Sequence, residues 1–89
     1  MPVLITAEVP GQTPEGYDAT LQILGNAIKS APGFVCHGAY ASPDGWRVFE
    51  VWQSSKEAAD FFAKYVRPSL PPGIQPKRTV QELHSLIMV

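Results

Sequence analysis

The 89 residues, 9.7 kDa in mass, leave room for one small domain over residues 1–89, in which folding buries only about two thirds of the unfolded surface. Seven Lys and Arg against eight Asp and Glu give a net charge near −1, which excludes the basic surface of a typical nucleic-acid-binding protein. A single cysteine, Cys36, excludes an internal disulfide, and no apolar run is long enough to span a membrane, so we expect a cytoplasmic protein without nucleic-acid or membrane partners.

The first predicted elements are a strand and a helix. Residues 3–9 are mostly apolar and β-compatible, and Pro10-Gly11 ends this strand. Thr13 offers an N-cap hydroxyl and Pro14 suits the first helical position, so a helix begins here and ends at Pro32-Gly33. Apolar side chains at spacings of three and four predict its buried face: Tyr17, Leu21, Leu24 and Ile28.

A hairpin, a second helix and a last strand follow. Residues 34–41 and 46–53 read as two strands, and the tetrapeptide Ser42-Pro43-Asp44-Gly45 between them is typical of a tight turn. Ser54 and Glu57 have the spacing of a capping box, and Pro68 is expected to end the helix they begin. Its apolar face comprises Ala58, Phe61, Phe62 and Tyr65. Residues 79–89 read as the last strand, with one face made of Val80, Glu82, His84, Leu86 and Met88.

The order strand-helix-strand-strand-helix-strand predicts a ferredoxin-like α+β fold. In this arrangement a four-stranded antiparallel sheet carries both helices on one face. The other face holds Phe49, Val51 and Ile87, and no element of the chain remains to cover it. An uncovered apolar face of this size is typical of an association surface, so we expect a homodimer formed through the sheet.

The hairpin is expected to place a histidine beside a carboxylate. Strand alternation puts His37 on the face opposite Phe34. A four-residue turn pairs His37 with Glu50, whereas a bulge at Gly45 shifts the register by one residue and places His37 opposite Val51. We prefer the first register. A neighbouring carboxylate orients an imidazole as a general base, so His37 and Glu50 are the predicted catalytic residues.

Other side chains are candidates for ligand binding. Five of them are predicted to bind the substrate: Trp46, Trp52, Phe62, Tyr65 and His84. His37, His84 and Glu50 also make a 2-His-1-carboxylate set on paper, but strands at opposite edges of the sheet carry the two histidines. The sequence has no glycine-rich phosphate loop, Gly-x-Ser-x-Gly elbow or Cys-x-x-Cys motif, so we expect neither a metal nor a cofactor.

Two segments resemble a known family. Ala31-Pro32-Gly33-Phe34 and the run Gly-Trp-Arg-Val-Phe-Glu-Val-Trp-Gln-Ser over residues 45–54 are similar to the antibiotic biosynthesis monooxygenase group of dimeric α+β barrel proteins. The resemblance implies a ferredoxin-like subunit, a homodimer whose sheets form a barrel, and a cavity between sheet and helices. Haem-degrading members of this group use an Asn, a Trp and a His, of which only the Trp is matched here, by Trp52.

The expected function is that of a cofactor-independent monooxygenase acting on an aromatic, polyketide-like substrate. In this hypothesis His37, oriented by Glu50, deprotonates the substrate, whose anion reacts directly with O₂ while Trp52 and Phe62 stack on its rings. Two alternatives stay open. A cofactor-free cyclase or isomerase would use the same pocket for proton transfer alone, and a non-catalytic dimer would simply bind a small aromatic or apolar molecule.

Overall fold

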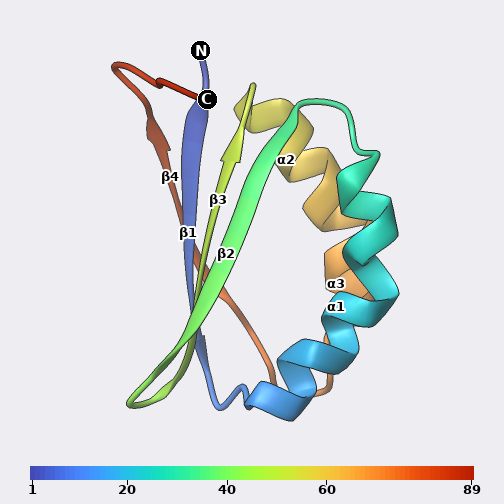
Figure 1. Cartoon of the computed structure of the whole chain (residues 1–89). Helices are drawn as coiled ribbons and strands as arrows, with labels where there is room; N and C mark the ends of the chain where they lie inside the picture. Colours follow the sequence, from blue (N-terminus) through green and yellow to red (C-terminus); the bar gives the residue numbers. More distant parts are fainter.

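The four strands form one antiparallel sheet, and all helical segments lie on one of its faces (Figure 1). The computed structural model describes all 89 residues. Its elements are β1 (Val3–Pro10), α1 (Pro14–Lys29), β2 (Phe34–Ser42), β3 (Gly45–Trp52), α2 (Ser55–Phe61), the π-helical turn η1 (Phe62–Val66), α3 (Arg67–Ser69) and β4 (Lys77–Glu82). The strand order β2-β3-β1-β4 confirms the ferredoxin-like α+β fold. None of the helices is long and apolar enough to cross a membrane.

Both long helices begin at the predicted caps. The Gly16 amide donates to the Thr13 hydroxyl at 3.0 Å, and the Glu57 amide donates to the Ser54 hydroxyl at 3.2 Å. The Ser54 hydroxyl in turn donates to the Glu57 carboxylate at 2.9 Å. Each cap satisfies an amide that has no partner within its helix, so the starts of α1 and α2 are set by local sequence.

The second helix does not end where the sequence suggested. It passes from α2 through the π-helical turn η1 into α3, and Pro68 lies in the first turn of α3 instead of stopping the helix. The wider π turn rotates the residues that follow, so Val66 and not Tyr65 follows Phe62 along the inner side of the helix.

The hairpin has the preferred register. Ala41 pairs with Trp46, and His37 pairs with Glu50. The loop contains only two residues, since Ser42 and Gly45 also pair. A Cβ atom at residue 45 would collide with the carbonyl oxygen of Val9, so only glycine fits at the start of β3.

A bulge in β2 places Phe34 on the face of the sheet opposite to the predicted one. Phe34 pairs with Trp52 and Cys36 with Val51, which leaves the intervening residue unpaired. This extra residue turns Phe34 to the same face as His37, where its ring packs edge-on against Trp52 at 5.4 Å between centroids. The prediction that Phe34 lies opposite His37 is therefore wrong.

The last strand is shorter than predicted and begins earlier. It starts at Lys77 and stops at Glu82, whose partner Val3 is the first residue of β1. Because β4 pairs only with β1, the chain beyond Glu82 has no strand to pair with. The predicted strand face through His84, Leu86 and Met88 therefore does not form. After β4 the chain continues as a terminal segment without regular structure (Figure 1).

The core lies between the sheet and the helices. Its members are Val3, Ile5, Ile28, Trp52, Ala58 and Phe61. On the opposite face of the sheet, Tyr40 and Phe49 are exposed, and the Phe49 ring covers Gly38. Val51 was expected to be exposed on this face but is buried, because Leu4 and Cys36 flank it in the middle of the sheet. Ile87, also assigned to this face, lies beyond the end of β4.

Candidate active site

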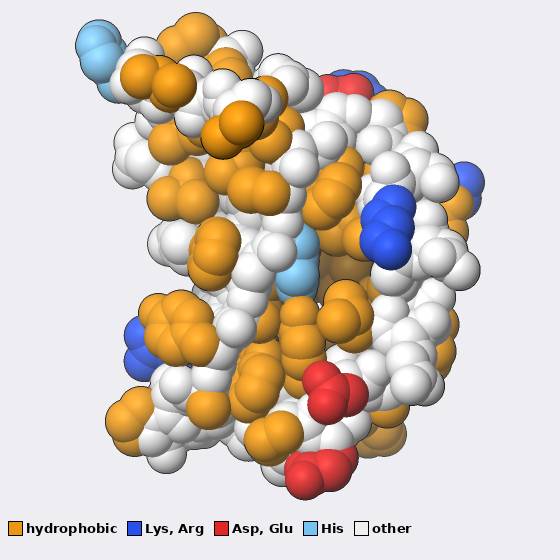
Figure 2. Space-filling model, in the orientation of Figure 1, with side chains coloured by type: hydrophobic (Ala, Val, Ile, Leu, Met, Phe, Trp, Pro, Cys, Tyr) orange, Lys and Arg blue, Asp and Glu red, His pale blue; other side chains and the backbone are white.

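A cavity separates the inner face of the sheet from the helices. Its volume is about 120 Å³, it is partly open to solvent, and 14 of its 20 lining residues are hydrophobic, so its walls suit an apolar ligand. Figure 2 shows this hollow between the sheet on the left and the helices on the right, with a histidine side chain at its wall. All four residues of the predicted apolar face of α1 line it: Tyr17, Leu21, Leu24 and Ile28.

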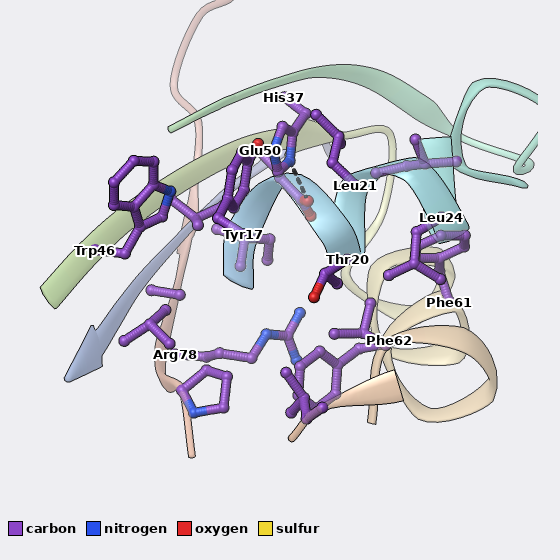
Figure 3. A pocket seen from close by; sticks show the side chains of 18 of the residues that line it. Tyr17, Thr20, Leu21, Leu24, His37, Trp46, Glu50, Phe61, Phe62 and Arg78 are labelled. Atoms are coloured by element: carbon purple, nitrogen blue, oxygen red, sulfur yellow. Dashed lines mark hydrogen bonds and ion pairs between the residues drawn. The ribbon is translucent and has the colours of Figure 1, made fainter. Parts of the chain in front are cut away.

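A chain of hydrogen bonds runs along one wall of the cavity (Figure 3). The hydroxyl of Tyr17 lies 2.6 Å from Nε2 of His37, and Nδ1 of His37 lies 2.7 Å from Oε2 of Glu50. Because a carboxylate only accepts hydrogen bonds, Nδ1 carries the proton and Nε2 of the neutral ring accepts from Tyr17. The other oxygen of Glu50, Oε1, accepts from Nε1 of Trp52 at 2.9 Å.

Strand register and helix position bring these groups together. His37 and Glu50 are directly opposite in β2 and β3, and Trp52 follows Glu50 by two residues on the same face. Tyr17, in the first turns of α1, lies above them, with its ring parallel to that of His37 and 5.2 Å from that of Trp46 between centroids. Each functional group is therefore held by a regular element.

Burial keeps the Tyr17 phenol protonated. Desolvation raises its pKa above the ordinary value, and the negative charges of Glu50 and then Asp18 raise it further. Tyr17 is thus a hydrogen-bond donor at neutral pH. The side chains of His37 and Glu50 are 18% and 17% exposed, so their ion pair is largely shielded from water whenever the imidazole takes up a second proton.

Arg78 provides a cation within the cavity. It pairs with Ala7 on the inner face of β4, and its guanidinium lies 4.1 Å from the centroid of the Phe62 ring. Burial lowers the pKa of Arg78 below its ordinary value. Trp46 also lines the cavity, and its Nε1 is buried and has no hydrogen-bond partner.

The predicted site residues divide into two groups. His37, Glu50, Trp46 and Phe62 line the cavity. Trp52 does not, because it is fully buried in the core, so the expected stacking of Trp52 on a substrate is wrong. Tyr65 lies outside the cavity as well. It borders a groove between α1 and the second helix, to which the π turn directs it.

The second histidine is remote from the first. His84 follows the end of β4, and β2 and β4 are the two edge strands of the sheet. His84 therefore does not line the cavity, which corrects its assignment as a substrate-binding residue. For the same reason the set of His37, His84 and Glu50 does not come together as a metal site.

Two residues of the site were not assigned a function from the sequence. The apolar spacing predicts Tyr17 on the buried face of a helix, because spacing alone does not distinguish a packing residue from one whose hydroxyl reaches a histidine. Arg78 lies just before the strand that the sequence predicts to start at residue 79. A strand that begins two residues earlier, at Lys77, places Arg78 on the same inner face as Val80, because side chains two residues apart point to the same side.

Comparison with known proteins identifies the fold. No model of a known family and no curated protein sequence matches the chain. Among solved structures, SnoaB, a cofactor-independent oxygenase from Streptomyces nogalater, superposes with a TM-score of 0.74 at 13% identity, over 97% of this chain and 96% of its own. The ActVA-Orf6 monooxygenase of Streptomyces coelicolor, in complex with nanaomycin D, gives 0.63 at 22% identity over 99% and 91%. The chain has the fold of the antibiotic biosynthesis monooxygenases.

The same monooxygenase-like fold occurs with other activities. The haem degrader MhuD from Mycobacterium tuberculosis matches with a TM-score of 0.63 at 14% identity, over 99% of this chain and all of its own. Trp52, the single residue that matches the haem-degrading pattern, is buried here and bonded to Glu50. The activity of this chain must therefore be argued from its own side chains.

Proposed function

We propose that this protein is a cofactor-independent monooxygenase that oxidises an aromatic, polyketide-like substrate. The observation that carries the proposal is the continuous hydrogen-bonded chain from Tyr17 through His37 to Glu50, which lies along the wall of a largely apolar cavity. The chain supplies a base, and the apolar walls of the cavity suit an aromatic ring system. The monooxygenase-like fold is consistent with both.

Proton removal begins the reaction. A phenolic or anthrone-type substrate gives a proton to the Tyr17 oxygen while the Tyr17 proton passes to Nε2 of His37. Because the raised pKa of Tyr17 disfavours free tyrosinate, the Tyr17 oxygen gains the substrate proton as it loses its own to His37. The Glu50 carboxylate, 2.7 Å from Nδ1, stabilises the imidazolium that forms.

Oxygen transfer follows from the substrate anion. The delocalised carbanion gives its electron pair to O₂, forming a carbon–oxygen bond and a peroxide. The peroxide takes back the proton held by the Tyr17–His37 pair, which we call the proton relay. It then loses water as the second C–H proton is removed, and this elimination leaves a carbonyl group. One O₂ is consumed and one water released for each CH₂ group converted to C=O. The apolar walls limit the contact of the anion and the peroxide with water.

Oxygen uptake with 1,8-dihydroxyanthrone, a phenolic anthrone, tests this function. The native protein is expected to consume one O₂ per anthrone. His37→Ala is expected to lower kcat by about 100-fold or more, the usual contribution of a general base. His84→Ala, which removes a histidine outside the cavity, is the matched control and should keep full activity. Unchanged kcat in His37→Ala would contradict the assignment of the base.

The same proton relay suits a cofactor-free cyclase or isomerase, since proton transfer alone requires no oxygen. Conversion of the substrate without O₂ uptake, again lost in His37→Ala, would favour that function. Binding of the anthrone without any conversion would instead favour the non-catalytic ligand-binding protein.

We also propose that the protein works as a homodimer formed through the outer face of the sheet. Tyr40 and Phe49 are 57% and 42% exposed there. The subunit exposes 5869 Å² in all, more than the roughly 5,100 Å² expected for a compact monomer of this mass. A second copy covering this face would bury both aromatic side chains and lower the exposed area of each subunit.

A further inference from the structure

We propose that Arg78 makes the cavity specific for aromatic carboxylates, with the guanidinium binding the acid group while the rings lie along the apolar walls. The inference rests on the proposed function, because it takes the cavity to be the substrate site, and it adds the chemical class of that substrate.

The guanidinium is directed into the cavity. Arg78 lies on the inner face of β4, and Figure 3 shows its side chain extending toward Thr20 and beside Phe62. The guanidinium lies over the Phe62 ring, a contact that uses none of its five N–H donors. Those donors stay available at the edge of the group, where a carboxylate binds.

No protein group forms an ion pair with this cation. Arg78 makes no hydrogen bond or ion pair, whereas Arg47 on the outer face contacts Glu8 at 3.3 Å. Glu50 is the single acidic residue lining the cavity, and its two oxygens are already bonded to His37 and Trp52. Arg78 is only partly buried, but even partial burial without a partner is unfavourable for a charged group, and a ligand carboxylate relieves it with two parallel hydrogen bonds.

The two charges in the cavity also determine the orientation of a bound ligand. The negative charge of Glu50 repels a ligand carboxylate from the wall that carries His37, and the positive charge of Arg78 attracts it. An aromatic acid held by Arg78 therefore presents its opposite end to Tyr17. This orientation separates the binding group of the substrate from the carbon that loses its proton.

Calorimetric titration with 2-naphthoate and the isosteric neutral 2-naphthamide at pH 7 tests the inference. The native protein is expected to bind the acid at least tenfold more tightly than the amide. Arg78→Met should abolish this preference, and Arg78→Lys should keep part of it, because lysine retains the charge but not the planar fork. Arg47→Met, which removes the same charge from the outer face, should leave the preference unchanged.

Equal affinity for the two ligands, no binding of 2-naphthoate, or a preference that survives in a folded Arg78→Met variant would overturn the inference. His37→Ala separates it from the proposed function, since that variant should keep the acid preference while losing oxygen uptake. An acid preference without any oxygen uptake would leave this inference standing and remove the monooxygenase. Oxygen uptake with 1,8-dihydroxyanthrone but no preference for the acid would support the monooxygenase and overturn this inference.

Discussion

Glu50 joins the candidate site to the hydrophobic core through its two oxygens. One accepts from His37 and the other from the fully buried Trp52. Trp52→Phe should therefore lower the free energy of unfolding by about 2–3 kcal/mol, because it opens a cavity and leaves Glu50 with an unpaired oxygen. Trp46→Phe is the matched control: its indole N–H has no partner, so a loss below about 1 kcal/mol is expected. Urea unfolding of both variants gives the comparison, and equal losses would contradict it.

The pKa of Tyr17 predicts how stability changes at alkaline pH. Its folded pKa is raised above the ordinary value of about 10, so the folded state holds this proton more tightly than the unfolded chain. The resulting stabilisation is fully present below pH 10 and is lost as pH rises through the folded pKa. Tyr17→Phe should cost about 1 kcal/mol at pH 7, for the lost bond to His37, and should make the decline above pH 10 shallower. Urea unfolding between pH 7 and pH 11.5 measures both, and parallel declines in the two proteins would contradict the assignment.

At the scale of the elements, two glycines with different surroundings should respond oppositely to alanine. Gly25 lies inside α1 with no atom near the position of a Cβ, so Gly25→Ala should stabilise the protein by about 0.5–1 kcal/mol. At Gly45 a Cβ meets the backbone carbonyl of Val9, which cannot move without disturbing β1. Gly45→Ala should therefore destabilise by about 1–3 kcal/mol. Thermal melts of the pair test this, and the same sign for both would contradict it.

Elements governed by local sequence were predictable, and those governed by pairing partners were not. The caps at Thr13 and Ser54 and the hairpin register depend on a few adjacent residues, and the structure confirms them. The end of β4 depends on where its partner β1 begins. The π turn that starts at Phe62 was not predictable, because the apolar spacing of this segment fits an ordinary α-helix equally well. The site follows the same division. The pairing of His37 with Glu50 came from register, whereas Tyr17 and Arg78 required the packing of a helix and an edge strand against the hairpin.

At the scale of the whole molecule, the exposed outer face predicts self-association. Sedimentation velocity at micromolar concentration should show a dimer. Phe49→Lys, which places a charge at the centre of the proposed interface, should shift the protein to monomer. Lys56→Glu also changes an exposed charge but lies on the helical face, so it should leave the dimer intact. A native protein that sediments as a monomer would exclude the interface.

The bond between Trp52 and Glu50 has a practical consequence. The chain contains two tryptophans, and Trp52 lies one hydrogen bond away from the carboxylate that holds His37. Proton uptake by His37 changes the charge next to the Trp52 indole, and with it the ultraviolet absorption and fluorescence of that ring. In a Trp46→Phe background the protein therefore carries its own optical reporter of the proton relay, readable in a stopped-flow instrument without any attached dye.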